Sequence, residues 1–423
     1  MKQRHIVLAL LCGVSAITFL DRLALPVAEA GVRADLHLGP AQWGWVLSAY
    51  VLANALFEIP SGALGDRHGR RAELTRIAAW WSFFTAATAW CRNFLSIASA
   101  RFLFGVGAAG AYPNAAGVVG RWFPRTEHAR AQGFIWAAGR LGGALAPLLL
   151  VPLAADEGWR AIFYLLGAVG AVWAALWWAL FRDHPEANAR ITDDELAEIG
   201  ASTVTAAEVD PTALAEGREG IPWRALLGLG HLWLLIAAYF CYAWGSWFFF
   251  GWFTTWLVRG AGFTVADMGR WASLPFLMGV AGNLVGGALS ERLVRRWGRS
   301  RTYRVVTATC LTVSAALLLA MSAVRTHAAV IGLATAGFGV LDLMLPAAWA
   351  MAMSLGGRFG GTASAMMNTA GNLGGWVCTV AFGYLAAATG GYTLGLRSIA
   401  AMVLAAAVLF ALTDCTRGLP ELT

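Results

Sequence analysis

The sequence predicts an all-α polytopic membrane protein whose twelve transmembrane helices form two pseudo-symmetric six-helix bundles. Of its 423 residues, 58% are hydrophobic and only 13% are charged, whereas about a quarter of the residues in a soluble domain are charged. Apolar runs of about 20 residues, the length that spans a bilayer, recur from end to end. A transmembrane β-barrel would need alternating segments of about 10 residues, and these runs are continuous.

The predicted spans divide into two sets of six. We expect the first set at 6–28, 43–64, 74–92, 97–119, 130–154 and 159–181. We expect the second set at 230–258, 265–290, 305–324, 327–353, 361–388 and 392–413. Several exceed 20 residues, a length that a tilted helix accommodates.

One long polar stretch separates the two sets. The expected organisation is therefore an N-terminal bundle at 1–181, a cytoplasmic central loop at 182–228 and a C-terminal bundle at 229–423. Within the loop, Thr192 and Glu195 form a capping-box pattern ahead of apolar residues, which predicts a short helix.

Arginine placement predicts the orientation. All but one of the 31 basic residues are arginines, and loops on one side carry clusters such as 67–71 and 292–304. Loops on the other side carry isolated arginines. The positive-inside rule therefore predicts that both termini lie on the cytoplasmic side of the cell inner membrane. The first apolar run imitates a signal peptide, but it is too long and contains charges, so we expect a retained helix.

Composition and motifs argue against other functions. The net charge of +7 comes from loop arginines and gives no sign of nucleic-acid binding. The six cysteines have no metal-ligand spacing, and we expect neither a metal nor a cofactor. The G-x-G-x-x-G pattern at 105–110 lies inside an apolar run, so it indicates helix packing. A membrane-embedded enzyme is the alternative from another class, but no nucleophile elbow or phosphate loop supports it.

A short motif occurs once in each half. The first copy comprises Gly62, Gly65, Asp66, Arg67, Gly69, Arg70 and Arg71, and the second copy, which begins 225 residues later at Gly287, contains Glu291 and Arg292. Small residues let helices approach closely, the acid can cap or pair, and the arginines can anchor to phosphate headgroups. The repeat predicts two parallel halves. A role for these arginines in topology alone is the alternative.

Six of the charged residues inside predicted spans are candidate functional residues. They are Asp21, Arg22, Glu58, Arg101, Arg140 and Asp342. At about 3 kcal/mol each, leaving them all unpaired would cost roughly 18 kcal/mol, so they must pair, bind a ligand or face water. Several have polar or aromatic companions on the same helix face, namely Asn54, Trp136 and Trp349, while Asn368 and Asn372 share a face of the eleventh span.

This charge pattern predicts an anionic substrate. Five of the six charges are in the first half, and three of those are arginines, whose planar fork matches a carboxylate. Asp21 and Glu58 are then the candidates for proton coupling, because a substrate that competes for the arginine lets a neighbouring acid take up a proton. Structural ion pairing between spans is the alternative for each residue.

Together, the twelve spans, the central loop and the repeated motif resemble the major facilitator superfamily, where that motif acts as a conformational latch. A closer resemblance, to the anion:cation symporter family within it, is carried by Phe19–Arg22, Arg101–Gly105, Ala111–Asn114, Arg121–Pro124, Gly158–Arg160 and Arg182–Glu186. That family includes transporters for galactonate, hexuronates and glucarate, as well as phthalate-type carriers.

The resemblance implies roles for three of the charged residues. Asp21 resembles the proton-titrating acid of the sugar-acid members, and Arg22 resembles the neighbouring arginine that binds the anion. Arg101 resembles an arginine of the same network, which Asp342 is expected to join. A second proton-linked glutamate of those members is replaced here by Ala108, and Glu58 is the candidate to substitute for it.

Two further departures concern the substrate. Arg140 stands where those members have a glutamine that contacts galactonate, and Asn54 stands where they have a tyrosine. Both changes argue against galactonate itself, and the extra arginine argues for a more anionic substrate or for a pair with Glu58. We expect Trp136, Trp349, Asn368 and Asn372 to complete the substrate site.

These inferences predict proton-coupled uptake of a small organic anion, such as a sugar acid or related carboxylate, by alternating access. The expected partners are the anion, protons and membrane lipids, and the expected state is a monomer. An organic-anion exchanger or exporter, or an aromatic-acid transporter, of the same fold is the alternative. A sensor that binds the anion without transporting it is a further alternative.

Overall fold

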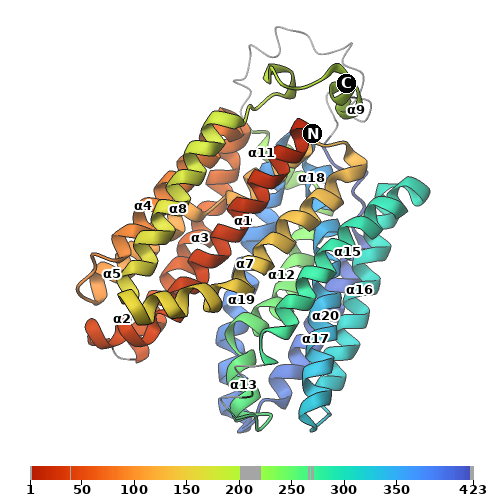
Figure 1. The fold of residues 1–423 in the computed structure, drawn as a ribbon. Coiled ribbons are helices and arrows are strands. Elements are labelled where there is room, and N and C mark those ends of the chain that lie inside the picture. The colour runs from red at the N-terminus through yellow and green to blue at the C-terminus, as the bar shows by residue number, and fades with distance from the viewer. Residues whose placement is uncertain (1, 39, 201–220, 265–266, 268–270, 420–423) are drawn as a thin grey trace.

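The computed structural model describes residues 2–38, 40–200, 221–264, 267 and 271–419, and these are helical with short connections (Figure 1). The first half contains α1 (Gln3–Val27), α2 (Glu29–Asp35), α3 (Pro40–His68), α4 (Arg70–Thr88), α5 (Phe94–Ala108), α6 (Ala111–Trp122), α7 (His128–Glu157) and α8 (Trp159–Leu180). The connecting region contains α9 (Asp193–Gly200) and α11 (Trp223–Gly228).

The second half repeats this plan. It contains α12 (Gly230–Gly251), α13 (Phe253–Arg259), α15 (Leu274–Trp297), α16 (Arg299–Met321), α17 (His327–Leu343), α18 (Leu345–Gly356), α19 (Gly360–Thr389) and α20 (Thr393–Leu412). In the part of the chain that the structure describes, three single turns of 3-10 helix lie in the connections, at Arg125–Glu127, Pro185–Ala187 and Gly357–Phe359.

The long helices coincide with the predicted spans, and eight spans in the described residues are long and apolar enough to cross a membrane. The span predicted at 265–290 is described as a long helix only from Leu274, and it continues to Trp297. Residues 265, 266 and 268–270 of that prediction lie outside the described residues. The arginine-rich end that we assigned to a loop is therefore a continuation of α15.

The fourth span of each half is broken, which the hydropathy pattern did not predict. The first break is at Gly110, whose φ of +85° suits a residue without a side chain. A Cβ there would lie 2.4 Å from the Ser61 hydroxyl oxygen, so glycine also permits the close approach of α3. The second break separates α17 from α18 at Met344, just before Pro346.

Helices pack mainly within their own half, and two seams join the halves. Within the halves, α1 packs against α7, α4 against α8, α12 against α19, and α16 against α20. Between the halves, α7 packs against α15 and α3 packs against α19. Residues in these two seams therefore decide how the halves are held together.

The connecting region lies at the end of the molecule that carries both chain termini, here called the termini end (Figure 1). There the backbone N–H of Glu195 donates to the Thr192 hydroxyl (3.3 Å), as a capping box requires. However, the Glu195 carboxylate accepts from the backbone N–H groups of Gln3 (2.9 Å) and Arg4 (2.8 Å). The predicted short helix is therefore present as α9, but the Glu195 side chain caps the first turn of α1 instead of its own helix.

Candidate functional site

Asp21 and Arg22 lie side by side on α1 in different environments. Asp21 is only 1% exposed, and neither of its carboxylate oxygens has a hydrogen-bond partner. Arg22 is half-buried, and its guanidinium lies 5.2 Å from the ring centre of Phe19, 5.5 Å from that of Tyr50 and 5.8 Å from that of Tyr112. A buried acid without partners and a cation surrounded by aromatic rings thus occupy consecutive positions.

Arg101, on α5, completes the charge group around Asp21. It is 2% exposed, and its Nε and Nη1 atoms have no hydrogen-bond partner. Its guanidinium lies 4.1 Å from the ring centre of Phe104. Asp21 and Arg101 interact electrostatically, so Arg101 supplies the compensating charge without a direct hydrogen bond to the acid.

Arg140 and Asp342 form a salt bridge between the two halves. Arg140 Nε donates to Asp342 Oδ2 (2.6 Å) and Nη2 donates to Oδ1 (3.0 Å), so the contact is bidentate. Their side chains are 3% and 0% exposed. Asn283 Nδ2 donates to the same carboxylate (3.1 Å), and Phe250 and Phe338 lie near the guanidinium. The pair therefore links α7 to α17 in an aromatic surrounding.

Glu58 is held by amides from the other half. Asn368 Nδ2 donates to Glu58 Oε1 (2.5 Å), and Asn372 Nδ2 donates to Oε2 (2.7 Å). Asn372 Nδ2 also lies 3.3 Å from the Asn54 side-chain oxygen. These four predicted residues meet in the seam between α3 and α19, where the two asparagines contact an acid of the protein.

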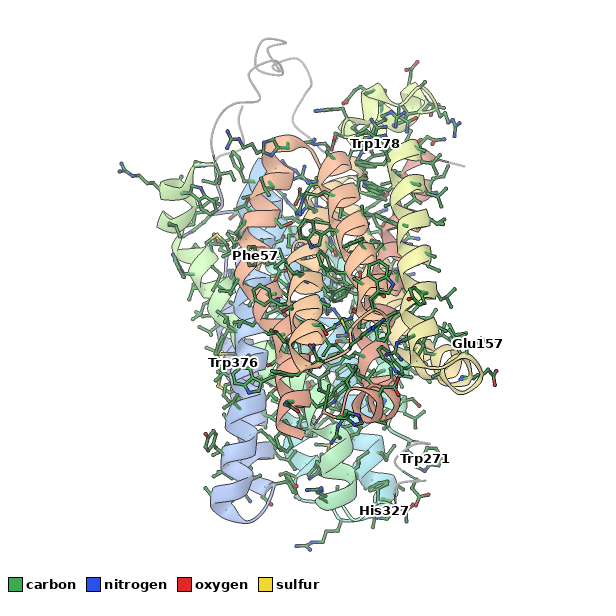
Figure 2. All side chains as sticks on the ribbon, turned by 90° about the vertical axis from the view of Figure 1, so that its left-hand side faces the viewer. Phe57, Glu157, Trp178, Trp271, His327 and Trp376 are labelled. Carbon is green, nitrogen blue, oxygen red and sulfur yellow. The ribbon has the colours of Figure 1, made fainter. Side chains whose placement is uncertain are left out.

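A group of aromatic side chains from both halves lies beside Arg22 and Arg140. Trp136 stacks on Tyr112 at 4.4 Å between ring centres, and Trp349 packs on Trp136 at 5.4 Å. Trp349 Nε1 donates to the Tyr239 hydroxyl (3.1 Å), whereas Trp136 Nε1 has no partner. The Tyr112 hydroxyl lies 3.0 Å from that of Ser15. Other large apolar side chains, such as Phe57 and Trp376, point outwards from the bundle (Figure 2).

The structure thus narrows the set of residues available for an anion. Arg140 contacts Asp342 rather than Glu58, so the expected pair with Glu58 is not present in this conformation. That salt bridge also cancels the positive charge that we had counted as surplus in the first half. Of the three candidate arginines, Arg22, Arg101 and Arg140, only Arg140 forms a salt bridge among the described residues. This leaves Arg22 as the half-buried cation beside the aromatic cluster.

Sequence reasoning missed several residues of this region. Tyr50 lies four residues before Asn54 and eight before Glu58, so the same helical spacing would have found it. Asn283 and Tyr239 contact the site from the second half. Each lies in a largely apolar run, and nothing in its spacing linked it to its partner.

The repeated motif lies where the halves meet at the termini end. Asp66 Oδ2 accepts from the backbone N–H (2.8 Å) and the hydroxyl (2.7 Å) of Thr362, across the seam, and Asp66 also pairs with Arg70. In the second copy, Glu291 accepts from Arg130 (3.4 Å) across the seam and from Arg295 (2.7 Å). The acid of each copy therefore contacts both halves.

The other motif residues lie around these contacts. Gly62 and Gly65 allow close approach, since a Cβ would lie 2.7 Å from Ala365 and 1.5 Å from Asn114. Gly69 has a φ of +92°, and the backbone N–H groups of Arg70 and Arg71, which follow Gly69, donate to the Asp183 carboxylate. The remaining arginines differ in setting: Arg71 lies 4.1 Å from the Trp178 ring centre, while Arg67 and Arg292 are exposed.

A bundle of bilayer-length helices in two halves, with charged residues buried between them, defines a multi-pass membrane transport protein. Comparisons with known proteins agree. A family model described as the Major Facilitator Superfamily matches residues 10–379, and the chain therefore belongs to this superfamily.

Transport proteins from bacteria are similar to most of the chain. The chain is 32% identical over 395 residues (93% of this chain and 90% of the relative) to the "Probable sulfoacetate transporter SauU" of Cupriavidus necator. It is 31% identical over 286 residues to the "Probable L-galactonate transporter" of Escherichia coli (68% of this chain and 61% of the relative). It is 28% identical over 381 residues to the "Hexuronate transporter" of Bacillus subtilis (88% of this chain and 86% of the relative).

Solved structures show the same fold. The proton:xylose symporter XylE bound to 6-bromo-6-deoxy-D-glucose superposes with a TM-score of 0.75 at 14% identity, over 95% of this chain and 94% of XylE. FucP in the outward conformation superposes with a TM-score of 0.69 at 15% identity, over 98% of this chain and 100% of FucP. The predicted fold and the resemblance to the anion:cation symporter family are confirmed. These relatives are transporters, so the prediction that the chain is not an enzyme is also confirmed.

Proposed function

We propose that the protein is a proton-coupled symporter that takes up a small organic anion, such as a sugar acid or a related carboxylate. The observation that carries this proposal is Arg22, a half-buried guanidinium next to aromatic rings, while Arg140 is already occupied by Asp342. A guanidinium fork binds a carboxylate or a sulfonate through paired N–H donors. The relatives named for sulfoacetate, galactonate and hexuronate transport support an anion with a carboxylate.

The proposed proton carrier is Asp21. Its carboxylate is buried without a hydrogen-bond partner, and Arg101 is the charge that acts on it. An anion that binds Arg22 brings negative charge next to this acid, which favours its protonated form. Glu58 is the second candidate, because Asn368 and Asn372 hold its carboxylate and Ala108 offers no acid at the position that the sugar-acid members use.

The motif copies are proposed to act as a latch. Asp66 and Glu291 hold the two halves together at the termini end, which the arginine distribution assigns to the cytoplasm. The contacts that we describe would then close the cytoplasmic side, and they must break for the anion to leave there. We further propose a monomer with bundles at 1–181 and 229–423 on either side of the 182–228 loop.

Uptake into proteoliposomes tests the transport proposal directly. We expect accumulation of at least one anion from a panel of sugar acids, dicarboxylates and sulfoacetate, and we expect an inwardly directed proton gradient to increase it. Protein-free liposomes provide the background. Uptake that does not respond to the gradient for any member of the panel would contradict symport and would favour an exchanger.

Replacing Asp21 by asparagine should separate proton coupling from anion binding. Asparagine keeps the size and an acceptor oxygen but cannot take up a proton, so gradient-driven accumulation should be lost while counterflow exchange continues. The measurements are accumulation under a proton gradient and exchange at equal pH. Glu58→Gln is the matched variant in the other cluster. Wild-type accumulation by Asp21→Asn would move the carrier role to Glu58.

A further inference from the structure

A pocket of about 420 Å³ lies in the seam between α7 and α15, near the termini end. Its lining residues are Arg130, Phe134, Leu284, Ala288, Glu291, Arg292 and Arg295. Phe134 is 40% exposed and Leu284 is 38% exposed, so the apolar part of the pocket faces outwards. In Figure 1 these two helices lie side by side, in agreement with their packing.

The pocket carries excess positive charge. Three arginines and one glutamate line it, which leaves two positive charges when the single negative charge is subtracted. Glu291 already accepts from Arg130 (3.4 Å) and Arg295 (2.7 Å), and the side chains of these two arginines are 53% and 63% exposed. Their remaining N–H donors can therefore reach an anion from outside the bundle.

We propose that this pocket binds one anionic phospholipid from the surrounding leaflet. The phosphate would contact Arg130, Arg292 and Arg295, and an acyl chain would lie along Phe134 and Leu284. Arginines at the membrane surface attract anionic headgroups, and charge-assisted hydrogen bonds to phosphate are strong. The combination of basic and outward-facing apolar residues in one pocket favours a lipid over a soluble anion.

The site is complete only when this seam is closed. Arg130 and Phe134 come from the first half, whereas Arg292 and Arg295 come from the second. Helices α7 and α15 approach closely at glycines in this seam, since a Cβ on Gly133 would lie 2.6 Å from the Asn283 carbonyl oxygen. A phosphate bound by arginines of both halves would therefore bridge them and stabilise the conformation that we describe.

Native mass spectrometry of the detergent-purified protein tests this inference. The probe is dioleoyl-phosphatidylglycerol, titrated against the wild type and against Arg130→Gln/Arg292→Gln/Arg295→Gln. At about fivefold per arginine, the triple variant should bind this lipid about 100-fold more weakly. The matched control is Arg190→Gln/Arg224→Gln/Arg417→Gln, which removes the same charge from exposed positions at the same end and should bind like the wild type.

Two further measurements assign each outcome. Equal thermal unfolding midpoints of the two triple variants in neutral detergent would show that lost binding does not reflect misfolding. Glycerol phosphate should displace the lipid only weakly, because it lacks the acyl chains. Equal lipid binding by both triple variants would overturn the site, and displacement by glycerol phosphate at the lipid's own concentration would overturn its assignment to a lipid.

Discussion

Replacing Arg22 by alanine should abolish anion binding. Truncating one member of a desolvated, hydrogen-bonded charge pair typically costs about 2–5 kcal/mol, which is roughly a 30-fold to several thousand-fold loss of affinity. Arg22 is the arginine that lies beside Tyr50 and Tyr112 and forms no salt bridge among the described residues. The measurement is binding of the transported anion to purified protein by calorimetry, with uptake into proteoliposomes alongside.

Two variants give this prediction its controls. Arg22→Lys keeps the charge but loses the planar fork, so we expect binding between that of the wild type and that of Arg22→Ala. Arg92→Ala removes an exposed arginine at the end of the molecule opposite the termini end, and this variant should bind the anion like the wild type. Normal binding by Arg22→Ala would show that the anion site lies elsewhere and would leave the Asn368 and Asn372 cluster as the next candidate.

The helices were predictable because a membrane span is determined by one local property. In a membrane, a run of about 20 apolar residues must pair its backbone N–H and C=O groups with one another, and an α-helix does this wherever the rest of the chain lies. The breaks at Gly110 and Met344 were not predictable in this way, because hydropathy stays high through both positions. Backbone conformation there depends on close packing, such as the approach of Ser61 to Gly110.

The candidate site shows a similar division. Burial of Asp21 and Arg140 could be predicted, since a charge inside a span must face protein or water. Their partners could not, because Arg140 and Asp342 are 202 positions apart and meet only when α7 and α17 pack together. The same holds for Glu58, which contacts Asn368 from 310 positions away. Composition predicts that such charges need partners, and only the packing of the halves identifies them.

Replacing Asp342 by asparagine should strongly destabilise the protein. Arg140 would keep its charge at 3% exposure without a carboxylate, and breaking a buried pair in this way costs about 3–5 kcal/mol. The measurement is SDS-induced and thermal unfolding of the purified variant in detergent. Asp35→Asn is the matched control, because Asp35 pairs with Arg160 at the same 2.6 Å but with both side chains at least 40% exposed. An exposed pair contributes about 0–1 kcal/mol.

The double variant Arg140→Gln/Asp342→Asn tests the physical cause. It removes both charges, so no uncompensated ion stays buried, and most of the lost stability should return. If the double variant is no more stable than Asp342→Asn, the damage comes from packing around Phe250 and Phe338 rather than from charge. Since the pair joins α7 to α17 across the two halves, a stable double variant also shows what the bridge does beyond stability. We expect it to transport more slowly than the wild type, because a bidentate contact between the halves also fixes how they align.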